Sequence, residues 1–250
     1  GQGYKISNLK INNPFLDDVG LFGVVQEGAQ VNNVGLINVS VKGGSSVGGL
    51  VGNLLGAVNN SYTTGVVEGE NQVGGLVGRH GAQPSMTITN SWSSAQVSGE
   101  SNIGGLVGFN ESSTITNSYS TGRVTGSGTV GGLVGNSSNS PITNSFWDTQ
   151  TSGLETSSGG VGKSTLQMKS LLTFNESWDI LDIYDFNSSD PSIWYIDDTN
   201  GYPQLFFEYV QPSIETQLAT DVTTSSIKLN GNITTLGVLG NAKVYFQYRE

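Results

Sequence analysis

The chain has 250 residues, only 12% of them are charged, and its net charge at pH 7 is −10. Basic residues are too few to build the positive patch that duplex DNA or an anionic membrane attracts, so we expect neither as a partner. The chain has no cysteine, which excludes disulfides, thiolate metal sites and cysteine nucleophiles.

The chain opens at residues 3–13 with a pattern that already reads as the interior of a folded unit. No apolar run approaches the roughly 20 residues that span a bilayer, and no signal peptide is visible. We therefore interpret the chain as a fragment, with any signal or anchor outside it.

One short phrase then occurs five times, and its starts lie at residues 19, 47, 73, 103 and 130. Its full form is Val47-Gly-Gly-Leu-Val-Gly52. A second phrase, Asn-Ser-aromatic, starts at residues 60, 90, 117 and 144. A fixed period between about 20 and 50 residues is typical of a stacked repeat.

A single repeat contains short β-prone runs separated by Gly and Ser, without helical periodicity. In the copy over residues 112–135, the pattern predicts strands at 114–120, 122–125 and 130–134. Three short strands per repeat indicate one coil of a β-helix, in which each strand pairs with its equivalent in the next coil. We therefore predict an all-β fold, a right-handed parallel β-helix (solenoid), over residues 1–150.

Stacking would align equivalent residues of successive coils in columns. The paired glycines would let the backbone turn sharply, so that Val47 and Leu50 both face the axis. The predicted columns are a leucine column, an aromatic column and an asparagine column whose amides bond one another. Their members are Leu50, Leu76, Leu106 and Leu133; Tyr62, Trp92, Tyr119 and Phe146; and Asn60, Asn90, Asn117 and Asn144.

These phrases and their spacing resemble the GLUG repeat family, from residue 3 to about residue 150. The opening residues 6–12 resemble the usual first unit, and Phe146-Trp-Asp-Thr149 resembles the usual exit from the last. Such repeats are associated with large secreted or surface proteins of bacteria and archaea, including adhesins and the non-catalytic parts of some immunoglobulin A peptidases. The resemblance implies a surface role and assigns no catalytic residue.

Residues 151–209 are expected to form a C-terminal capping segment. Residues 163–174 have helix-like spacing, with Ser164 or Thr165 as the N-cap. The preceding Gly159-Gly-Val-Gly-Lys-Ser-Thr165 resembles a phosphate loop, but it lacks the required spacing and no buried strand precedes it. We expect a glycine-rich entry to the capping helix instead.

The sequence pattern changes again near residue 210. Residues 219–234 and 242–249 alternate as antiparallel strands do. They resemble the first strands of a fibronectin type III-like domain. About 40 residues are less than half of such a domain, so we expect residues 210–250 to be an incomplete antiparallel β-sandwich module.

No catalytic, cofactor-binding or metal site is expected. His80 is the only histidine, which excludes a two-histidine zinc peptidase site, and we expect it in a solvated loop. Residues 197–201 place oxygen ligands near a Gly turn, but they lack the full calcium-loop pattern. Binding specificity should lie where the copies differ, so the expected ligand surface comprises Arg79, His80, Phe109 and Asn110.

We therefore expect a non-enzymatic, extracellular or cell-surface structural or adhesion protein without cofactors. Its solenoid would be a spacer or a ligand surface. Glycans, or surface molecules of host or neighbouring cells, are the expected partners, through exposed polar side chains near Tyr and Trp. Two alternatives stay open: a polysaccharide-active β-helix enzyme, and the non-catalytic region of a larger secreted peptidase.

Overall fold

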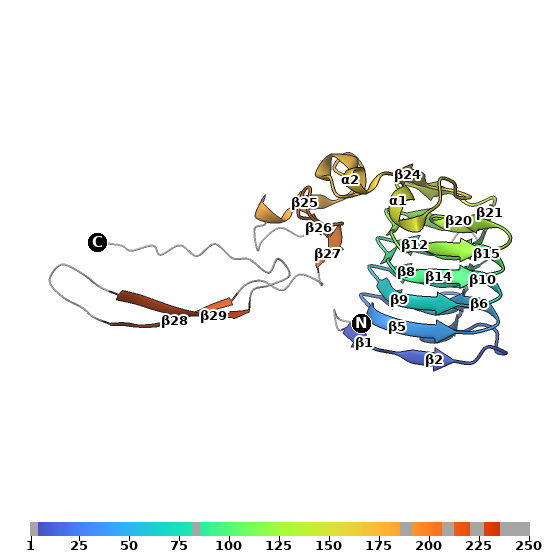
Figure 1. The fold of residues 1–250 in the computed structure, drawn as a ribbon, viewed down its shortest axis with the longest axis horizontal. Helices are drawn as coiled ribbons and strands as arrows, with labels where there is room; N and C mark the ends of the chain where they lie inside the picture. The colour runs from blue at the N-terminus through green and yellow to red at the C-terminus, as the bar shows by residue number, and fades with distance from the viewer. Residues whose placement is uncertain (1–4, 82–85, 186–191, 207–212, 221–227, 236–250) are drawn as a thin grey trace. The chain divides into compact units, whose positions relative to one another are not determined.

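The computed structural model describes residues 5–81, 86–185, 192–206, 213–220 and 228–235. The chain separates into two units, residues 1–205 and 206–250. In the first unit, flat strands lie one above another in successive coils (Figure 1). No helix in the described ranges is long and apolar enough to cross a membrane.

Four sheets, here numbered I to IV, form the walls of the solenoid, and every strand pair in them is parallel. Sheet I contains β1 (Lys5–Ser7), β5 (Gly35–Lys42), β9 (Tyr62–Glu68), β13 (Trp92–Ser93), β18 (Tyr119–Ser120), β23 (Phe146–Asp148) and β24 (Val161–Lys163), with β2 (Lys10–Asn12), β14 (Gln96–Gly99) and β19 (Val124–Gly126) beside them. Sheet II contains β6 (Ser45–Gly48), β10 (Asn71–Gly74), β15 (Ser101–Gly104) and β20 (Val130–Gly131).

The remaining walls follow the same order along the chain. Sheet III contains β3 (Phe22–Val25), β7 (Val51–Leu54), β11 (Val77–His80), β16 (Val107–Glu111) and β21 (Val134–Ser138). Sheet IV contains β4 (Gln30–Asn32), β8 (Ala57–Asn59), β12 (Thr87–Thr89), β17 (Thr114–Thr116) and β22 (Ile142–Thr143). The predicted parallel β-helix of about five coils is confirmed.

Each coil has one more corner than the sequence predicts. The expected strand 130–134 is divided into β20 and the start of β21, because the backbone turns at the glycine pair. A Cβ added at the equivalent Gly104 would overlap the carbonyl oxygen of Val107. Glycine is therefore required at this corner, which brings Val130 and Leu133 towards the same core.

The leucine column is confirmed, since Leu50, Leu76, Leu106 and Leu133 are all 0% exposed. A second glycine column accommodates the β-branched residues next to it. A Cβ on Gly69 would lie 2.8 Å from a methyl group of Val47 and 2.8 Å from one of Val73. The core is therefore built from complementary glycine and Val/Ile columns as well as from leucine.

The asparagine column does not form the predicted amide ladder. The column members Asn60, Asn90, Asn117 and Asn144 have φ between 47° and 49°, the left-handed region that asparagine tolerates better than other residues with a side chain. They form a corner, and Oδ1 of Asn60 and of Asn117 has no hydrogen-bond partner among the described residues.

Serine supplies the ladder instead, from the position after each asparagine. The hydroxyl oxygen of Ser118 accepts a bond from the backbone N–H of Ser91, one coil earlier, at 3.2 Å. The same hydroxyl donates to the carbonyl oxygen of Thr116 at 2.8 Å. Equivalent bonds are made by Ser61, Ser91 and Ser145. Each serine thus ties two coils together at the corner.

The C-terminal end of the solenoid is covered by short elements: α1 (Thr149–Ser152), α2 (Thr165–Met168) and the 3-10 turn η1 (Leu171–Thr173). The predicted helix over 163–174 is shorter, since it ends at Met168. Ser164 is its N-cap, and Gln167 completes a capping box. Ser157 substitutes for a further coil, because its hydroxyl accepts the backbone N–H of Val134 at 2.9 Å.

Buried Asp148 joins these elements. One carboxylate oxygen accepts bonds from the backbone of Gln150 and Thr151 and from the hydroxyl of Thr165, at 2.9 to 3.1 Å. The other accepts a bond from the Tyr202 hydroxyl at 2.7 Å. Burial and this carboxylate raise the pKa of Tyr202 to about 12. The pair therefore has a structural role, with the tyrosine protonated.

A further part of the capping segment packs on the flank of the solenoid, where we call residues 178–185 and 192–205 the strap. It contains β25 (Ile180–Asp182), the 3-10 turn η2 (Ile183–Asp185), β26 (Trp194–Ile196) and β27 (Gln204–Leu205). Its anchors are the indole of Trp178, which donates to the carbonyl oxygen of Asn144 at 2.8 Å, and the Pro203 carbonyl, which accepts from the Tyr119 hydroxyl at 2.6 Å.

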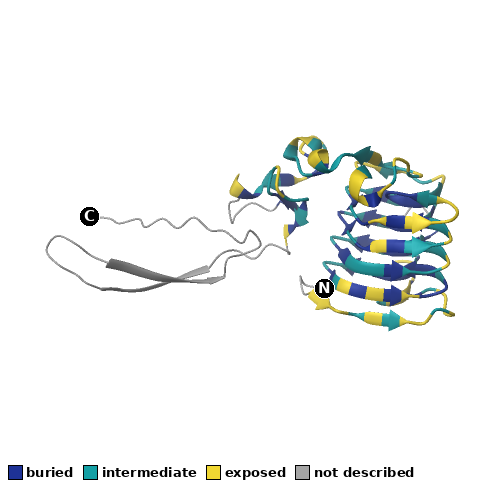
Figure 2. Ribbon diagram, viewed as in Figure 1, coloured by how far each residue is buried: buried dark blue, intermediate teal, exposed yellow. Residues whose placement is uncertain are grey.

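The first coil has a neighbouring coil on one side, and it is much more exposed than the others (Figure 2). The second unit is described over β28 (Ser213–Thr220) and β29 (Lys228–Thr235), which pair antiparallel. Much of residues 210–250 lies outside the described residues, and the fibronectin type III-like identity stays a prediction.

Candidate ligand-binding surface

The sequence-predicted ligand residues lie on two neighbouring strands, with Arg79 beside Phe109 and His80 beside Asn110. Alternate residues of a strand point to opposite faces. Arg79 and Phe109 face outward and are half-buried, whereas His80 and Asn110 are 0% exposed. The prediction of a solvated loop for His80 is therefore wrong, and neither His80 nor Asn110 belongs to an outer ligand surface.

His80 occupies the core position that Leu54 fills one coil earlier and Asn110 one coil later. Neither ring nitrogen has a hydrogen-bond partner among the described residues, and the same holds for Oδ1 of Asn110. Burial lowers the pKa of His80 to about 3, while the neighbouring Asn110 amide opposes that shift. The imidazole is therefore neutral at pH 7 and part of the core.

The outward residue Arg79 forms an ion pair with Glu111 of the next coil, with 2.7 Å between Nη2 and the carboxylate oxygen. Both side chains are about a third exposed. A pair at this exposure contributes little to stability, about 1 kcal/mol or less. The Arg79 guanidinium is therefore partly buried and already paired with a carboxylate. This face is poorly suited to bind an anionic ligand.

The aromatic column is also withdrawn from solvent. The rings of Tyr62 and Trp92 are stacked with centroids 4.6 Å apart, and Trp92 and Tyr119 follow at 5.6 Å. Trp194 of the strap lies 5.9 Å from Tyr119, and its indole N–H reaches Oδ1 of Asn90 at 3.4 Å. All four rings of the column are at most 9% exposed, and strap side chains pack against Tyr119 and Phe146.

An open polar surface is found instead on the outer face of sheet I. We call each coil's strand segment in this sheet a rung, and equivalent outward residues of successive rungs form two columns. The first column consists of Lys10, Ser40, Val66 and Gln96, and the second of Asn12, Lys42, Glu68 and Ser98. Lys42 and Glu68 pair across neighbouring rungs at 3.1 Å and are 50% and 44% exposed. Short side chains beside this pair leave hollows in the surface.

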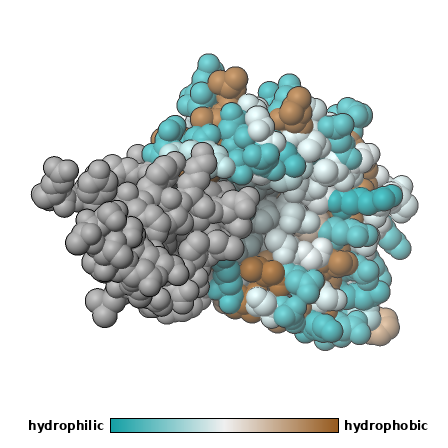
Figure 3. Space-filling view, turned by 60° about the vertical axis from the view of Figure 1, so that its left-hand side comes forward, coloured by the Kyte–Doolittle hydropathy of each residue, from teal (hydrophilic) through white to brown (hydrophobic). Residues whose placement is uncertain are grey.

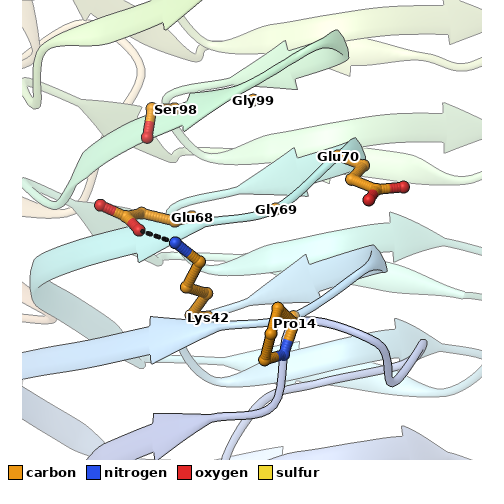
Figure 4. Close-up of a pocket in the computed structure, with 8 residues that line it drawn as sticks. Pro14, Lys42, Glu68, Gly69, Glu70, Ser98 and Gly99 are labelled. Carbon is orange, nitrogen blue, oxygen red and sulfur yellow. Dashed lines mark ion pairs between the residues drawn. The ribbon is translucent and has the colours of Figure 1, made fainter.

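One hollow of about 410 Å³ has Ser40 and Val66 in its floor and Lys10, Lys42 and Glu68 at its sides. A second, of about 330 Å³, lies at the adjoining corner beside Gly69. Figure 4 shows the Lys42–Glu68 ion pair that borders both hollows.

Carboxylates do not converge at this surface. Glu70 points away from the pair that Glu68 makes with Lys42 (Figure 4). Within the described ranges, no three His, Asp or Glu side chains are grouped so that they could hold a metal ion. The backbone carbonyl of Asp197 accepts bonds from the backbone N–H groups of Asn200 and Gly201, as in an ordinary turn. The geometry offers ion pairing and hydrogen bonding, without a visible acid–base pair.

The residues of the sheet I hollow were missed at the sequence level. Lys10, Ser40 and Val66 differ in chemistry, so they form no repeated phrase. They could have been found by their equivalent position in the repeat. Each comes directly before an inward-facing residue of its coil: Ile11, Val41 or Val67.

Comparison with known proteins agrees with the repeat pattern. The family described as "Glug: The GLUG motif" matches residues 99–125, so the chain contains a GLUG motif. Over 78 residues the chain is 47% identical to halomucin of Haloquadratum walsbyi (strain DSM 16790 / HBSQ001), a segment that covers 31% of this chain and 1% of halomucin. No solved structure matches the chain.

Proposed function

We propose that this chain is a non-enzymatic structural module of an extracellular or cell-surface protein, in which the solenoid is a stiff spacer that presents polar outer faces to glycans. The GLUG motif and the likeness to part of halomucin support a surface-associated structural role. Spacer and ligand surface are compatible, because the coils fix side chains in columns along the rod.

The observation that carries the proposal is the separation of chemistry between the two sides of each strand. Most inward columns are Val, Leu, Ile and Gly, whereas the two outward columns that begin at Lys10 and Asn12 hold polar or charged residues at every position except Val66. One face of the molecule is mainly hydrophilic or neutral, with small separate apolar spots (Figure 3). Such a surface suits hydroxyl-rich ligands better than an apolar protein partner.

A combined binding and turnover experiment tests the proposal. The purified 250-residue chain is applied to a glycan array, and it is incubated with neutral and acidic polysaccharides while reducing ends and unsaturated products are measured. Binding without turnover is the expected result. Release of either product would contradict the non-enzymatic proposal, and failure to bind any glycan would leave the spacer without its ligand face.

A further inference from the structure

The hollow over Ser40 and Val66 differs from the rest of the solenoid in its charge. The solenoid has five Lys and Arg residues, and four of them, Lys5, Lys10, Lys42 and Arg123, lie on the outer side of sheet I. Two of these border this one hollow, together with a single carboxylate. In a chain of net charge −10, this is a local site of positive charge.

Lys10 is the cation best placed to receive a ligand. Its side chain is exposed, and it forms no ion pair with a residue in the described part of the chain. Lys42 is held by Glu68, but both groups are about half exposed. An exposed pair of this kind is weak enough to exchange partners with an incoming anion.

The remaining lining favours hydroxyl groups. Ser40 both donates and accepts, the Asn12 amide does the same, and the Glu68 carboxylate accepts only. An acidic peptide would supply few hydroxyl donors to the Glu68 carboxylate. A ligand that carries one carboxylate and several hydroxyls satisfies the whole set.

A neutral sugar is disfavoured for a separate reason. Neutral sugars commonly gain affinity from stacking on aromatic rings, and the aromatic column of sheet I is buried. No aromatic side chain lines the hollow. Hydrogen bonds alone exchange with water at little net gain, so a charge contact is needed for binding.

We propose that this hollow binds the uronic acid units of an acidic glycan, with Lys10 pairing the sugar carboxylate and Ser40 and Glu68 bonding its hydroxyls. This assignment rests on the proposed glycan-presenting function, and it names the face and the ligand class. The volume of about 410 Å³ suits one or two sugar rings. A polymer would continue along the rungs, which are about 4.8 Å apart.

The test is an NMR titration of the isotope-labelled full chain with two sugars that differ at one group. Methyl β-glucuronide carries a carboxylate where methyl β-glucoside carries a hydroxymethyl group. We expect the glucuronide to shift the amide signals of Ser40, Val66 and Glu68, and to bind more weakly as salt screens the charges. The glucoside should leave these signals unchanged at the same concentration.

Two variants of equal charge change locate the site. Lys10→Gln should weaken glucuronide binding by up to about fivefold, the value of one exposed ion pair. Arg123→Gln removes the same charge from the same face but lies outside the hollow, so a single sugar cannot reach it, and binding should not change.

A third variant fills the hollow without changing the charge. Val66→Gln introduces the residue type that the same column already holds at Gln96, and it should abolish binding.

Several results would overturn the proposal. Equal binding of glucoside and glucuronide would remove the role of the charge, and equal binding of acetate would remove the role of the sugar. Equal losses in Lys10→Gln and Arg123→Gln would show general attraction rather than a site. Glycan-array binding that survives Val66→Gln would refute this hollow while leaving the proposed glycan function intact.

Discussion

The buried His80 makes the stability of the solenoid depend on pH in a defined direction. Its pKa is lowered from 6.5 to about 3 in the folded chain. Above pH 6.5 the imidazole is neutral in both states and has no effect. Between pH 6.5 and 3 the unfolded chain binds a proton that the folded chain excludes, so the free energy of unfolding falls as pH falls.

The size of this effect follows from the linkage relation. Each pH unit within the window costs about 1.4 kcal/mol, so lowering the pH from 7 to 5 should remove about 2 kcal/mol of the unfolding free energy. This interval is informative, because histidine is the only side chain whose ordinary pKa falls inside it, and His80 is the only histidine. The titration is therefore that of a single known group.

The assay is urea unfolding followed by tryptophan fluorescence, since all four tryptophans lie in the first unit. His80→Leu copies the Leu54 that occupies the same column one coil earlier. It should lose the pH dependence between 7 and 5 and match or exceed the stability of the parent at pH 7. His80→Gln, which keeps a polar side chain without a titrating group, should lose the dependence as well. A parent and variants with the same slope would refute the reasoning.

Three further substitutions, with Gly201→Ala as a control, test contacts in the solenoid and its cap by the same unfolding assay. Ser118→Ala removes both ladder bonds and should cost about 1 to 3 kcal/mol. Asp148→Asn leaves its four donors without their charged acceptor and should cost about 3 kcal/mol. Gly104→Ala forces a Cβ onto backbone atoms and should cost about 3 kcal/mol or more, whereas Gly201→Ala, where the nearest atom is 3.7 Å away, should stay within about 0.5 kcal/mol.

Results opposite to these would each remove one part of the account. An unchanged Ser118→Ala variant would mean that water replaces the serine ladder without cost. A neutral Asp148→Asn would show that the cap holds through its apolar contacts alone. Equal effects of the two glycine substitutions would contradict the steric origin of the Gly104 corner.

The repeat could be recognised from the sequence because the same residue type recurs at the same position of each copy. Leu50 and its equivalents lie where the pattern predicts, and the paired glycines form a corner. The asparagine column was misread, because an amide ladder and a left-handed corner both favour asparagine, and only the backbone angle φ distinguishes them. The serine that makes the ladder was next to it in every copy.

Features that occur only once in the chain could not be predicted from the repeat pattern. The strap meets the solenoid through contacts such as Trp194 with Asn90, 104 residues apart in the chain, and no copy exists to reveal it. His80 was a partial exception. Alignment of Val51-Gly-Asn-Leu54 with Val77-Gly-Arg-His80 places the histidine in the Leu54 column, a signal outweighed by the general preference of histidine for the surface.

The solenoid requires coils that stack in register, and one distance measurement tests this stacking. The chain has no cysteine, so Lys10→Cys with Arg123→Cys gives two unique sites for nitroxide spin labels on the outer face of sheet I. Four rungs separate these positions, which predicts a narrow distribution of electron–electron distances near 19 Å, widened by the label arms. A broad distribution, or one centred beyond about 30 Å, would contradict the stacked solenoid.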